Sequence, residues 1–270
     1  MYKKAFFGAC AERLFRYFKM ILTSKNNPLI KETASLKEKK GRKQLGLFLV
    51  EGWKMAKECQ KSGFTIERIF VADSYQGEMC FDPEKTVRVS DDVFAHLSDE
   101  KTPQGVLCRV KIPEKKLCPP SGKCLFLDGV SDPGNLGAIL RTANAAGYNE
   151  VYLTKECVDP YAPKSVRASM SGLFFTQLYF GERSEILSVL DGTPIFVADM
   201  DGENVFTATA PEKFALVIGN EANGVSQETF EKATKTIKIP MSDTQESLNA
   251  AVSAGIIMYL LNKERFIKSE

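Results

Sequence analysis

The residues best suited to chemistry stand in two polar loops, each directly after a short apolar run. The first loop, Gly219–Ser226, reads GNEANGVS, and the second, Ile239–Asn249, reads IPMSDTQESLN. Carboxylates, amides and hydroxyls alternate there with glycine and proline, which let the backbone approach a ligand closely. Open α/β sheets bind ligands at the carboxyl ends of their strands. We therefore expect both loops to border one binding site.

A third polar loop lies further upstream. Residues 128–141 read DGVSDPGNLGAILR, a loop followed by a helical pattern that we expect to end at Gly147. Either Asp132 or Asn135 could cap this helix. The glycines are spaced G-x4-G-x2-G, and the following strand does not end on a clean acidic residue. The segment is therefore not a dinucleotide fingerprint, and we set aside a nucleotide-dependent oxidoreductase.

Metal and disulfide chemistry find no support in the sequence. The chain has one histidine, His96, and seven scattered cysteines without a C-x-x-C pair. We expect no metal site and no disulfide framework, and the reduced cysteines indicate a cytoplasmic protein. His96 is interpreted as a surface or core residue. No apolar run approaches the ~18 residues of a membrane span, so we expect no membrane partner.

Three segments together resemble the motifs of the SpoU (TrmH-like) group of SPOUT RNA 2′-O-methyltransferases. Asn135–Arg141 is similar to that family's N-x-G-x-x-x-R, and Gly219–Ser226 to its G-x-E-x-x-G-x-S. The last segment, Ile239–Asn249, is similar to its I-P-M…S-L-N. The resemblance spans about residues 122–265. One departure is Asp243, which stands where glycine is common in the family.

The resemblance implies a fold and an assembly. The fold is an α/β domain with a parallel sheet, whose C-terminal loops and helix form a deep trefoil knot, an exception to the usual rule against knots. The knot would build a pocket for S-adenosyl-L-methionine, and a homodimer would place the active site near its interface. Small residues in Ala250–Gly255 suit a helix that packs tightly against backbone. An ordinary well-packed helix would also explain them.

The resemblance further implies a group of catalytic residues. Methyl transfer from a sulfonium to a ribose hydroxyl requires alignment of the two reactants and removal of a proton. Arg141 would hold a phosphate beside the ribose rather than act as a base, because a guanidinium stays protonated. Asn135 would orient the hydroxyl or Arg141, unless it only caps its helix. Glu221 would shape the catalytic pocket, although a helix-start charge is the alternative. Ser247 and Asn249 would complete the group.

The same resemblance implies the cofactor contacts, through backbone and apolar groups. The residues expected to bind S-adenosyl-L-methionine are Gly219, Asn220, Ile239 and Leu248.

Residues 25–110 alternate short strands and helices, and with their opening Asn27-Pro-x-Ile-Lys31 they resemble an L30e-like substrate-binding domain. A single helix is expected after Pro28, with Gly41 near its end. Its charges suit RNA phosphates, although a solvated helix face is the alternative. The residues expected to contact RNA are Lys31, Lys39, Lys40, Arg42 and Lys43, with Arg167 in the second domain.

The second domain is expected to contain short, wholly apolar strands, as in a parallel sheet buried on both faces. Among its elements are one helix over Pro163–Leu173 and a strand over Ile195–Ala198 with a loop, DMDGEN, after it.

At 270 residues with a net charge of +2, the chain has the size of two medium domains and no strong overall field. We divide it into an extension at 1–24, an L30e-like domain at 25–111, a proline-rich linker at 112–122 and a SPOUT domain at 123–270. The amphipathic extension is interpreted as a membrane-surface helix, a targeting peptide or a packed or disordered arm. Met20 is an alternative start.

The sequence thus predicts S-adenosylmethionine-dependent methylation of a ribose 2′-hydroxyl, in 23S or other large-subunit ribosomal RNA. The alternatives are a transfer-RNA 2′-O-methyltransferase and a non-catalytic RNA-binding protein that uses the L30e-like domain.

Overall fold

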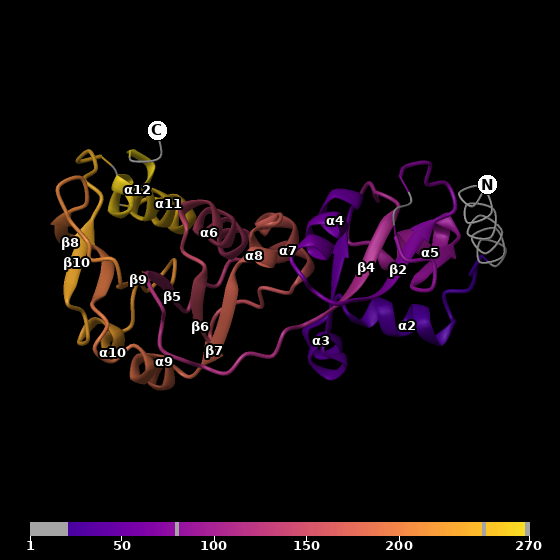
Figure 1. The fold of residues 1–270 in the computed structure, drawn as a ribbon, viewed down its shortest axis with the longest axis horizontal. Coiled ribbons are helices and arrows are strands. Elements are labelled where there is room, and N and C mark those ends of the chain that lie inside the picture. The colour runs from indigo at the N-terminus through magenta and orange to yellow at the C-terminus, as the bar shows by residue number, and fades with distance from the viewer. Residues whose placement is uncertain (1–20, 79–80, 245–246, 268–270) are drawn as a thin grey trace, which may run out of the picture. The chain divides into compact units, whose positions relative to one another are not determined.

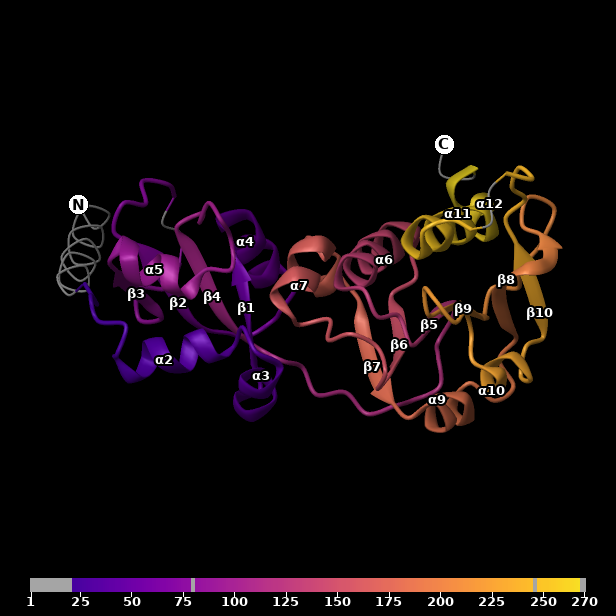
Figure 2. The same ribbon diagram turned by 180° about the vertical axis from the view of Figure 1, so that it is seen from behind.

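The structure, a computed structural model, describes residues 21–78, 81–244 and 247–267. The predicted extension at 1–24 lies almost wholly outside these residues. The chain divides into two compact units (Figures 1 and 2), which are described separately. The first comprises Met1–Pro113 with Tyr161–Pro163, and the second Glu114–Pro160 with Lys164–Glu270.

The first unit is a four-stranded sheet with helices on its faces. The strand order is β1-β4-β2-β3, and only the β2–β3 pair is parallel. Apolar side chains of α2 and α5 share a core with inward side chains of all four strands. The elements are α2 (Pro28–Ser35), α3 (Lys39–Leu45), β1 (Leu47–Glu51), α4 (Trp53–Lys61), β2 (Ile66–Ala72), β3 (Thr86–Val89), α5 (Asp91–Leu97) and β4 (Val106–Lys111).

The basic segment after Pro28 forms two helices, α2 and α3, where the sequence predicted one. Arg42 is 4% exposed, and its Nη1 donates to the carbonyl oxygens of Leu36 at 2.8 Å and Lys37 at 2.7 Å. These bonds satisfy carbonyls beyond the end of α2 and hold the chain in its turn. At Gly41 a Cβ atom would lie 2.1 Å from the Ser35 carbonyl oxygen, so only glycine permits this packing.

The second unit is a six-stranded sheet of order β10-β8-β9-β5-β6-β7, in which every neighbouring pair is parallel. Helices α6 and α11 lie side by side along one face (Figure 1), and α9 packs on the other face. The elements are β5 (Cys124–Asp128), α6 (Pro133–Ala146), β6 (Glu150–Thr154), α7 (Pro163–Ser169), α8 (Gly172–Phe175), β7 (Gln177–Gly181), α9 (Arg183–Val189), β8 (Ile195–Asn204), β9 (Ala215–Gly219), α10 (Gln227–Phe230), β10 (Lys235–Lys238), α11 (Ala250–Leu261) and α12 (Lys263–Ile267).

Two elements of this unit differ from the prediction. The helix predicted over Pro163–Leu173 is interrupted at Met170, which adopts a left-handed φ of 48°. The interruption lets α8 restart at Gly172, where a Cβ atom would lie 2.6 Å from the Arg141 Cα. Strand β8 runs through the predicted loop DMDGEN because its distal half pairs with β10. The sequence did not predict the second half of this strand, because most of its residues are polar.

The predicted linker is an ordered strap on the second unit. The hydroxyl of Tyr152 donates to the Cys118 carbonyl oxygen at 2.9 Å, and the backbone N–H of Ser121 donates to Glu150 at 2.9 Å. Lys115 donates to the side-chain oxygen of Gln177 at 2.8 Å. Its three prolines and its lack of periodicity predicted a linker without contacts of its own. Hydrogen bonds instead fix this segment to β6 and β7.

No helix within 21–78, 81–244 and 247–267 is long and apolar enough to cross a membrane.

Candidate active site

The site lies where the direction of the sheet connections reverses. From β5 the chain builds outward to β6 and β7, and then crosses to the other side of β5 to add β8, β9 and β10. The carboxyl ends of β5 and β9 therefore meet with their loops diverging, the usual position of a ligand crevice. The loop after β5 leads into α6, and the loop after β9 is the GNEANGVS segment.

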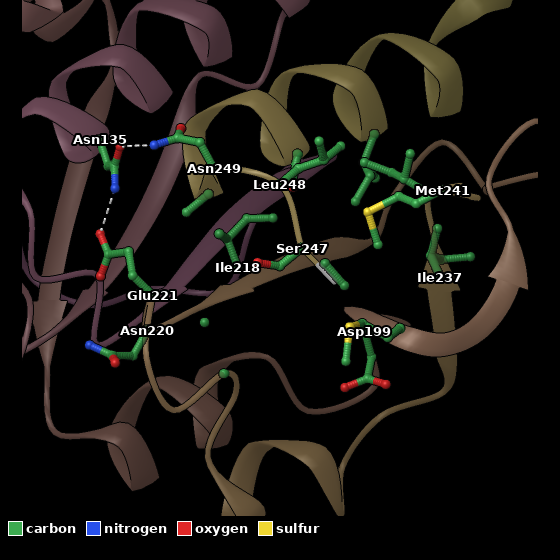
Figure 3. A pocket seen from close by; sticks show the side chains of 18 residues that line it. Asn135, Asp199, Ile218, Asn220, Glu221, Ile237, Met241, Ser247, Leu248 and Asn249 are labelled. Carbon is green, nitrogen blue, oxygen red and sulfur yellow. Dashed lines mark hydrogen bonds between the residues drawn. The ribbon is translucent and has the colours of Figure 1, made fainter. Parts of the chain in front are cut away.

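A cavity of about 560 Å³ opens at this edge (Figure 3). Backbone and apolar groups make most of its wall, and a group of amides and carboxylates borders it. Its lining residues are Asn135, Ala198, Asp199, Met200, Ile218, Gly219, Asn220, Glu221, Gly224, Ile237, Ile239, Met241, Ser247, Leu248, Asn249, Ala250, Ser253 and Ile257. All four residues predicted to bind the cofactor are among them, as are four of the five predicted catalytic residues.

Glu221 joins the β9 loop to the β5 loop. Its Oε2 accepts from the Ser131 N–H at 3.0 Å and hydroxyl at 2.8 Å, and its Oε1 accepts from the Asp132 N–H at 3.1 Å. Oε1 also accepts from Nδ2 of Asn135 at 2.9 Å. The carboxylate thus accepts four hydrogen bonds, three from the loop after β5 and one from the first turn of α6. These bonds connect the two loops, and the N-terminal cap of the following helix, α10, is Ser226 rather than Glu221.

The hydrogen-bond chain continues from Asn135 to the last loop (Figure 3). Nδ2 of Asn249 donates to Oδ1 of Asn135 at 2.8 Å. Oδ1 of Asn249 caps α11 by accepting from the N–H groups of Ala251 at 2.9 Å and Val252 at 3.3 Å. The side-chain amide of Asn135, bonded to both Glu221 and Asn249, thereby links all three sequence motifs.

The cap of α6 is Asp132, whose Oδ1 accepts from the Asn135 N–H at 2.8 Å. Asn135 is therefore not the cap, and its own side chain is committed to Glu221 and Asn249. Of the two capping residues that the sequence left open, the structure selects Asp132.

The charge of Glu221 is well stabilised. Partial burial alone would raise its pKa, but the hydrogen bonds from Asn135 and Ser131 outweigh this effect and lower the pKa to about 2. Glu221 is therefore an anion at any working pH. It cannot serve as a general base with a pKa near neutrality.

A partly buried ion pair between Asp128 and Arg183, which the sequence did not predict, stands beneath the loop after β9, and Asp128 holds that loop through Ser226. Oδ2 of Asp128 accepts from the Ser226 hydroxyl at 2.7 Å and N–H at 3.0 Å, and Oδ1 accepts from Nε of Arg183 at 2.8 Å. Burial would raise the pKa of Asp128, but these donors lower it overall. The signal in the sequence was an aspartate at the end of an otherwise apolar strand.

Close backbone packing shapes the same loop. At Gly219 a Cβ atom would lie 2.3 Å from the carbonyl carbon of Gly224. The backbones of Asn220 and Gly224 exchange hydrogen bonds at 2.8 and 2.9 Å. The Asn220 side chain donates from Nδ2 to the Gly129 carbonyl oxygen at 2.8 Å. Both predicted cofactor residues of this loop, Gly219 and Asn220, line the cavity, and the Asn220 amide also ties the loop to Gly129.

Arg141 is the predicted catalytic residue that does not line the cavity. It lies six residues beyond Asn135 on α6, about 9 Å along the helix axis. Its side chain is exposed and makes no hydrogen bond or ion pair within the described part of the chain. The cavity of one chain is therefore assembled without it.

The predicted RNA-binding residues fall into two groups. Arg42 is buried and bonds to backbone carbonyls, so its guanidinium stabilises the turn after α2 and, contrary to the prediction, does not face RNA. The remaining members are exposed side chains: Lys31, Lys39, Lys40 and Lys43 in the first unit and Arg167 in the second. His96 is also exposed, as one of its two interpretations required.

The described residues contain no group of three side chains arranged to hold a metal ion. The side chains that line the cavity supply amides, hydroxyls and two carboxylates, those of Glu221 and Asp199.

Comparison with known proteins identifies this arrangement. Residues 122–259 match the SpoU rRNA Methylase family, and residues 27–108 match the MRM3-like substrate binding domain. The chain belongs to the SpoU rRNA methylase family. The family match covers every residue of the hydrogen-bond chain from Glu221 to Asn249. The prediction from the three motifs is thereby confirmed.

Similar proteins share both units of this SpoU methylase. The 23S rRNA (guanosine(2553)-2′-O)-methyltransferase RlmP of Bacillus subtilis is 32% identical over 89% of this chain and 98% of its own. A putative RNA methyltransferase of the TrmH family from Porphyromonas gingivalis superposes with a TM-score of 0.77 at 30% identity, covering 87% of this chain and 97% of its own. The SpoU methyltransferase AviRb from Streptomyces viridochromogenes, solved in complex with AdoMet, gives 0.80 at 25% identity over 89% and 99%.

Proposed function

We propose that this SpoU methylase transfers a methyl group from S-adenosyl-L-methionine to a ribose 2′-hydroxyl of large-subunit ribosomal RNA. The observation that carries the proposal is the Glu221–Asn135–Asn249 chain at the border of the cavity. The relatives add weight, because RlmP is named for 2′-O-methylation of 23S rRNA and AviRb was solved with AdoMet.

The cavity fits the proposed cofactor. Apolar walls at Ile218, Ile239 and Leu248 suit the flat face of adenine, and the exposed backbone of Gly219 suits its polar edges. The bound cofactor would supply an electrophilic methyl group on a sulfonium. The volume of about 560 Å³ lies within the range of small-molecule sites.

The residues of the chain would then align the hydroxyl and steady the charges that develop. Asn135 keeps one Nδ2 hydrogen beyond its bond to Glu221 and can present it to the incoming hydroxyl oxygen. Ser247, in the cavity wall, and Asn249 complete the polar border. Arg141 supplies a phosphate clamp through the fork of its planar guanidinium, and the proton leaves to water or phosphate.

We propose that the protein acts as a homodimer and that the dimer brings Arg141 to a cavity. Helix α11 is apolar on its outward side as well, where Val252 is 50% and Tyr259 42% exposed. An apolar side on a helix that already packs on α6 favours a further partner. The position of Arg141 outside the cavity wall of its own chain supports a site completed by the second copy.

The domain division, the trefoil knot and the cytoplasmic location stay predictions. We propose that residues 25–111 grip RNA through their exposed lysines, while residues 123–270 carry out the chemistry. Deleting residues 25–110 is expected to reduce RNA affinity strongly and to leave cofactor affinity within about threefold, because no cavity residue lies in that range. A collapse of cofactor binding would contradict the division.

The test of the proposed function is a map of 2′-O-methyl groups in ribosomal and transfer RNA from cells with and without the protein. We expect one ribosomal position to lose its methyl group, and the purified wild-type chain to restore it with S-adenosylmethionine. Loss of a methyl group only in transfer RNA would contradict the choice of substrate. Failure of the purified chain to bind S-adenosylmethionine would leave the non-catalytic RNA-binding protein as the explanation.

A further inference from the structure

The cavity holds a second carboxylate, Asp199, that none of the roles above uses. Asp199 follows the buried part of β8 and lines the cavity together with Ala198 and Ile237. Figure 3 shows it on the side of the cavity away from Asn135 and Asn249. The cavity therefore has polar groups on two opposite sides, with apolar wall between them.

The two carboxylates that line the cavity differ in the number of hydrogen bonds that they accept within the protein. Glu221 accepts four hydrogen bonds. Asp199 accepts one, from the Asp201 N–H to Oδ1 at 2.9 Å, and no group among the described residues donates to its Oδ2. A carboxylate offers about four lone-pair sites. Asp199 therefore keeps most of its acceptor capacity for a ligand in the cavity.

The surroundings of Asp199 indicate which part of a ligand it meets. The cavity wall near it is apolar, formed by Ala198 and Met200 of β8 and Ile237 of β10. Such a wall accommodates a nucleoside better than the charged amino-acid end of the cofactor. A nucleoside offers two neighbouring hydroxyl donors on its ribose, and acidic residues beyond strands in nucleotide-binding sheets accept hydrogen bonds from such hydroxyls.

We propose that Asp199 accepts hydrogen bonds from the ribose hydroxyls of the cofactor's adenosine, and so makes the cavity selective for that ribose. The assignment rests on the proposed function. Asp199 is exposed, so its replacement removes an acceptor without opening the core. Asp201 lies two residues along the same strand and does not line the cavity, which makes it a matched control.

The experiment is calorimetric titration of the full-length protein with S-adenosylhomocysteine and with 5′-methylthioadenosine, which lacks the amino-acid part. Asp199→Ala is expected to weaken both ligands by a similar factor, about ten- to hundredfold, as for loss of hydrogen bonds to a charged group. Asp201→Ala is expected to stay within about twofold of the wild type. The wild type is expected to lose affinity for 2′-deoxy or 3′-deoxy 5′-methylthioadenosine, whereas Asp199→Ala is not.

Three results would overturn the assignment. Equal affinities of wild type and Asp199→Ala would show that the carboxylate does not meet the ligand. A loss confined to S-adenosylhomocysteine would show that it meets the ammonium of the amino-acid part instead. If the wild type bound neither compound, the proposed function itself would fail, and the assignment with it.

Discussion

At the scale of single residues, Glu221 controls the geometry of the site through its charge. Replacement by glutamine puts an amide with its own N–H groups opposite Ser131, Asp132 and Asn135, all of which donate to the carboxylate. We expect Glu221→Gln to lower the single-turnover methylation rate about ten- to hundredfold and cofactor affinity by less than about fivefold, because the loop network loosens while the apolar wall stays. Glu228→Gln, on α10 and outside the cavity wall, is the control.

The same carboxylate has a defined acid dependence. Its pKa is lowered from 4.5 to about 2 in the folded protein, so its ionised form stabilises the fold above pH 4.5. That stability falls as the pH drops from 4.5 toward 2. We expect the difference in unfolding free energy between wild type and Glu221→Gln to be constant above about pH 5 and to shrink below pH 4.5. A difference that does not change with pH in chemical denaturation would contradict this account.

Among single residues, the motifs indicated which loops meet, because each motif marks a loop that follows a strand. Glu221, Asn135 and Asn249 all lie where the motifs indicated. It did not reveal the second carboxylate, Asp199, which stands in a segment without a motif, or the partners of Asp128, because Arg183 and Ser226 are remote from Asp128 in sequence. Only the pairing of β5 with β9 and of β8 with β10 brings them to the site.

At the scale of elements, α11 depends on an N-terminal cap that is also part of the site. Asn249 both caps the helix and donates to Asn135. Asn249→Ser keeps an oxygen for the cap but loses the amide that reaches Asn135. We expect its midpoint of thermal unfolding to stay within about 2 °C of the wild type, since Ser and Asn cap equally well, while methylation falls at least about tenfold.

The comparison with Asn249→Ala separates the two roles. Alanine lacks the capping oxygen. We therefore expect Asn249→Ala to have an unfolding free energy about 0.5–2 kcal/mol lower than that of Asn249→Ser. If serine and alanine were equally destabilising, the cap would not be the stabilising interaction. If serine left methylation unchanged, the bond from Asn249 to Asn135 would have no part in the reaction.

The basic segment of the first unit shows where sequence patterns reach their limit. Four neighbouring cations on α3 have the same charge, yet Arg42 is buried and holds the turn after α2, while Lys39, Lys40 and Lys43 are exposed. Charge patterning cannot separate a buried guanidinium from an exposed ammonium, because the difference lies in the close approach of α3 to the end of α2 at Gly41.

These two kinds of cation respond differently to substitution. Arg42→Ala leaves two carbonyl groups without their donor, and we expect it to destabilise the first unit by about 1–3 kcal/mol in urea unfolding. The triple change of Lys39, Lys40 and Lys43 to alanine is expected to leave stability within about 0.5 kcal/mol and to reduce the slope of log K for RNA against log salt by up to about 2 to 3. An unchanged slope would exclude these lysines from the RNA surface.

At the scale of the whole molecule, the proposed dimer decides how Arg141 acts. Co-expression of Arg141→Ala with Asn249→Ser would place both defects in one half of the sites of each mixed dimer and neither defect in the other half, if Arg141 serves the partner's cavity. With random pairing we expect about a quarter of the wild-type methylation rate in the mixture, while each variant alone is expected to keep about a tenth of that rate or less. No recovery would mean that Arg141 serves its own chain.

The same scale shows which parts of the architecture a sequence can indicate. The short apolar strands predicted the parallel sheet of the second unit, and the alternating elements predicted the smaller sheet of the first. The proline-rich segment at 112–122 is predicted only as a linker. Its hydrogen bonds to Tyr152 and Glu150 could not be predicted, because these partners are remote in sequence.

The hydrogen bonds that link Glu221, Asn135 and Asn249 also bear on when, during folding, the second unit becomes able to bind a ligand. Asn135 is 86 residues from Glu221 and 114 from Asn249 in sequence. Contacts of such separation close large loops at a cost in conformational entropy, so we expect them to form late in folding. A chain that has built β5 and α6 but not yet docked α11 has an open cavity wall. Ligand binding therefore reports completed folding of the second unit rather than any partly folded state.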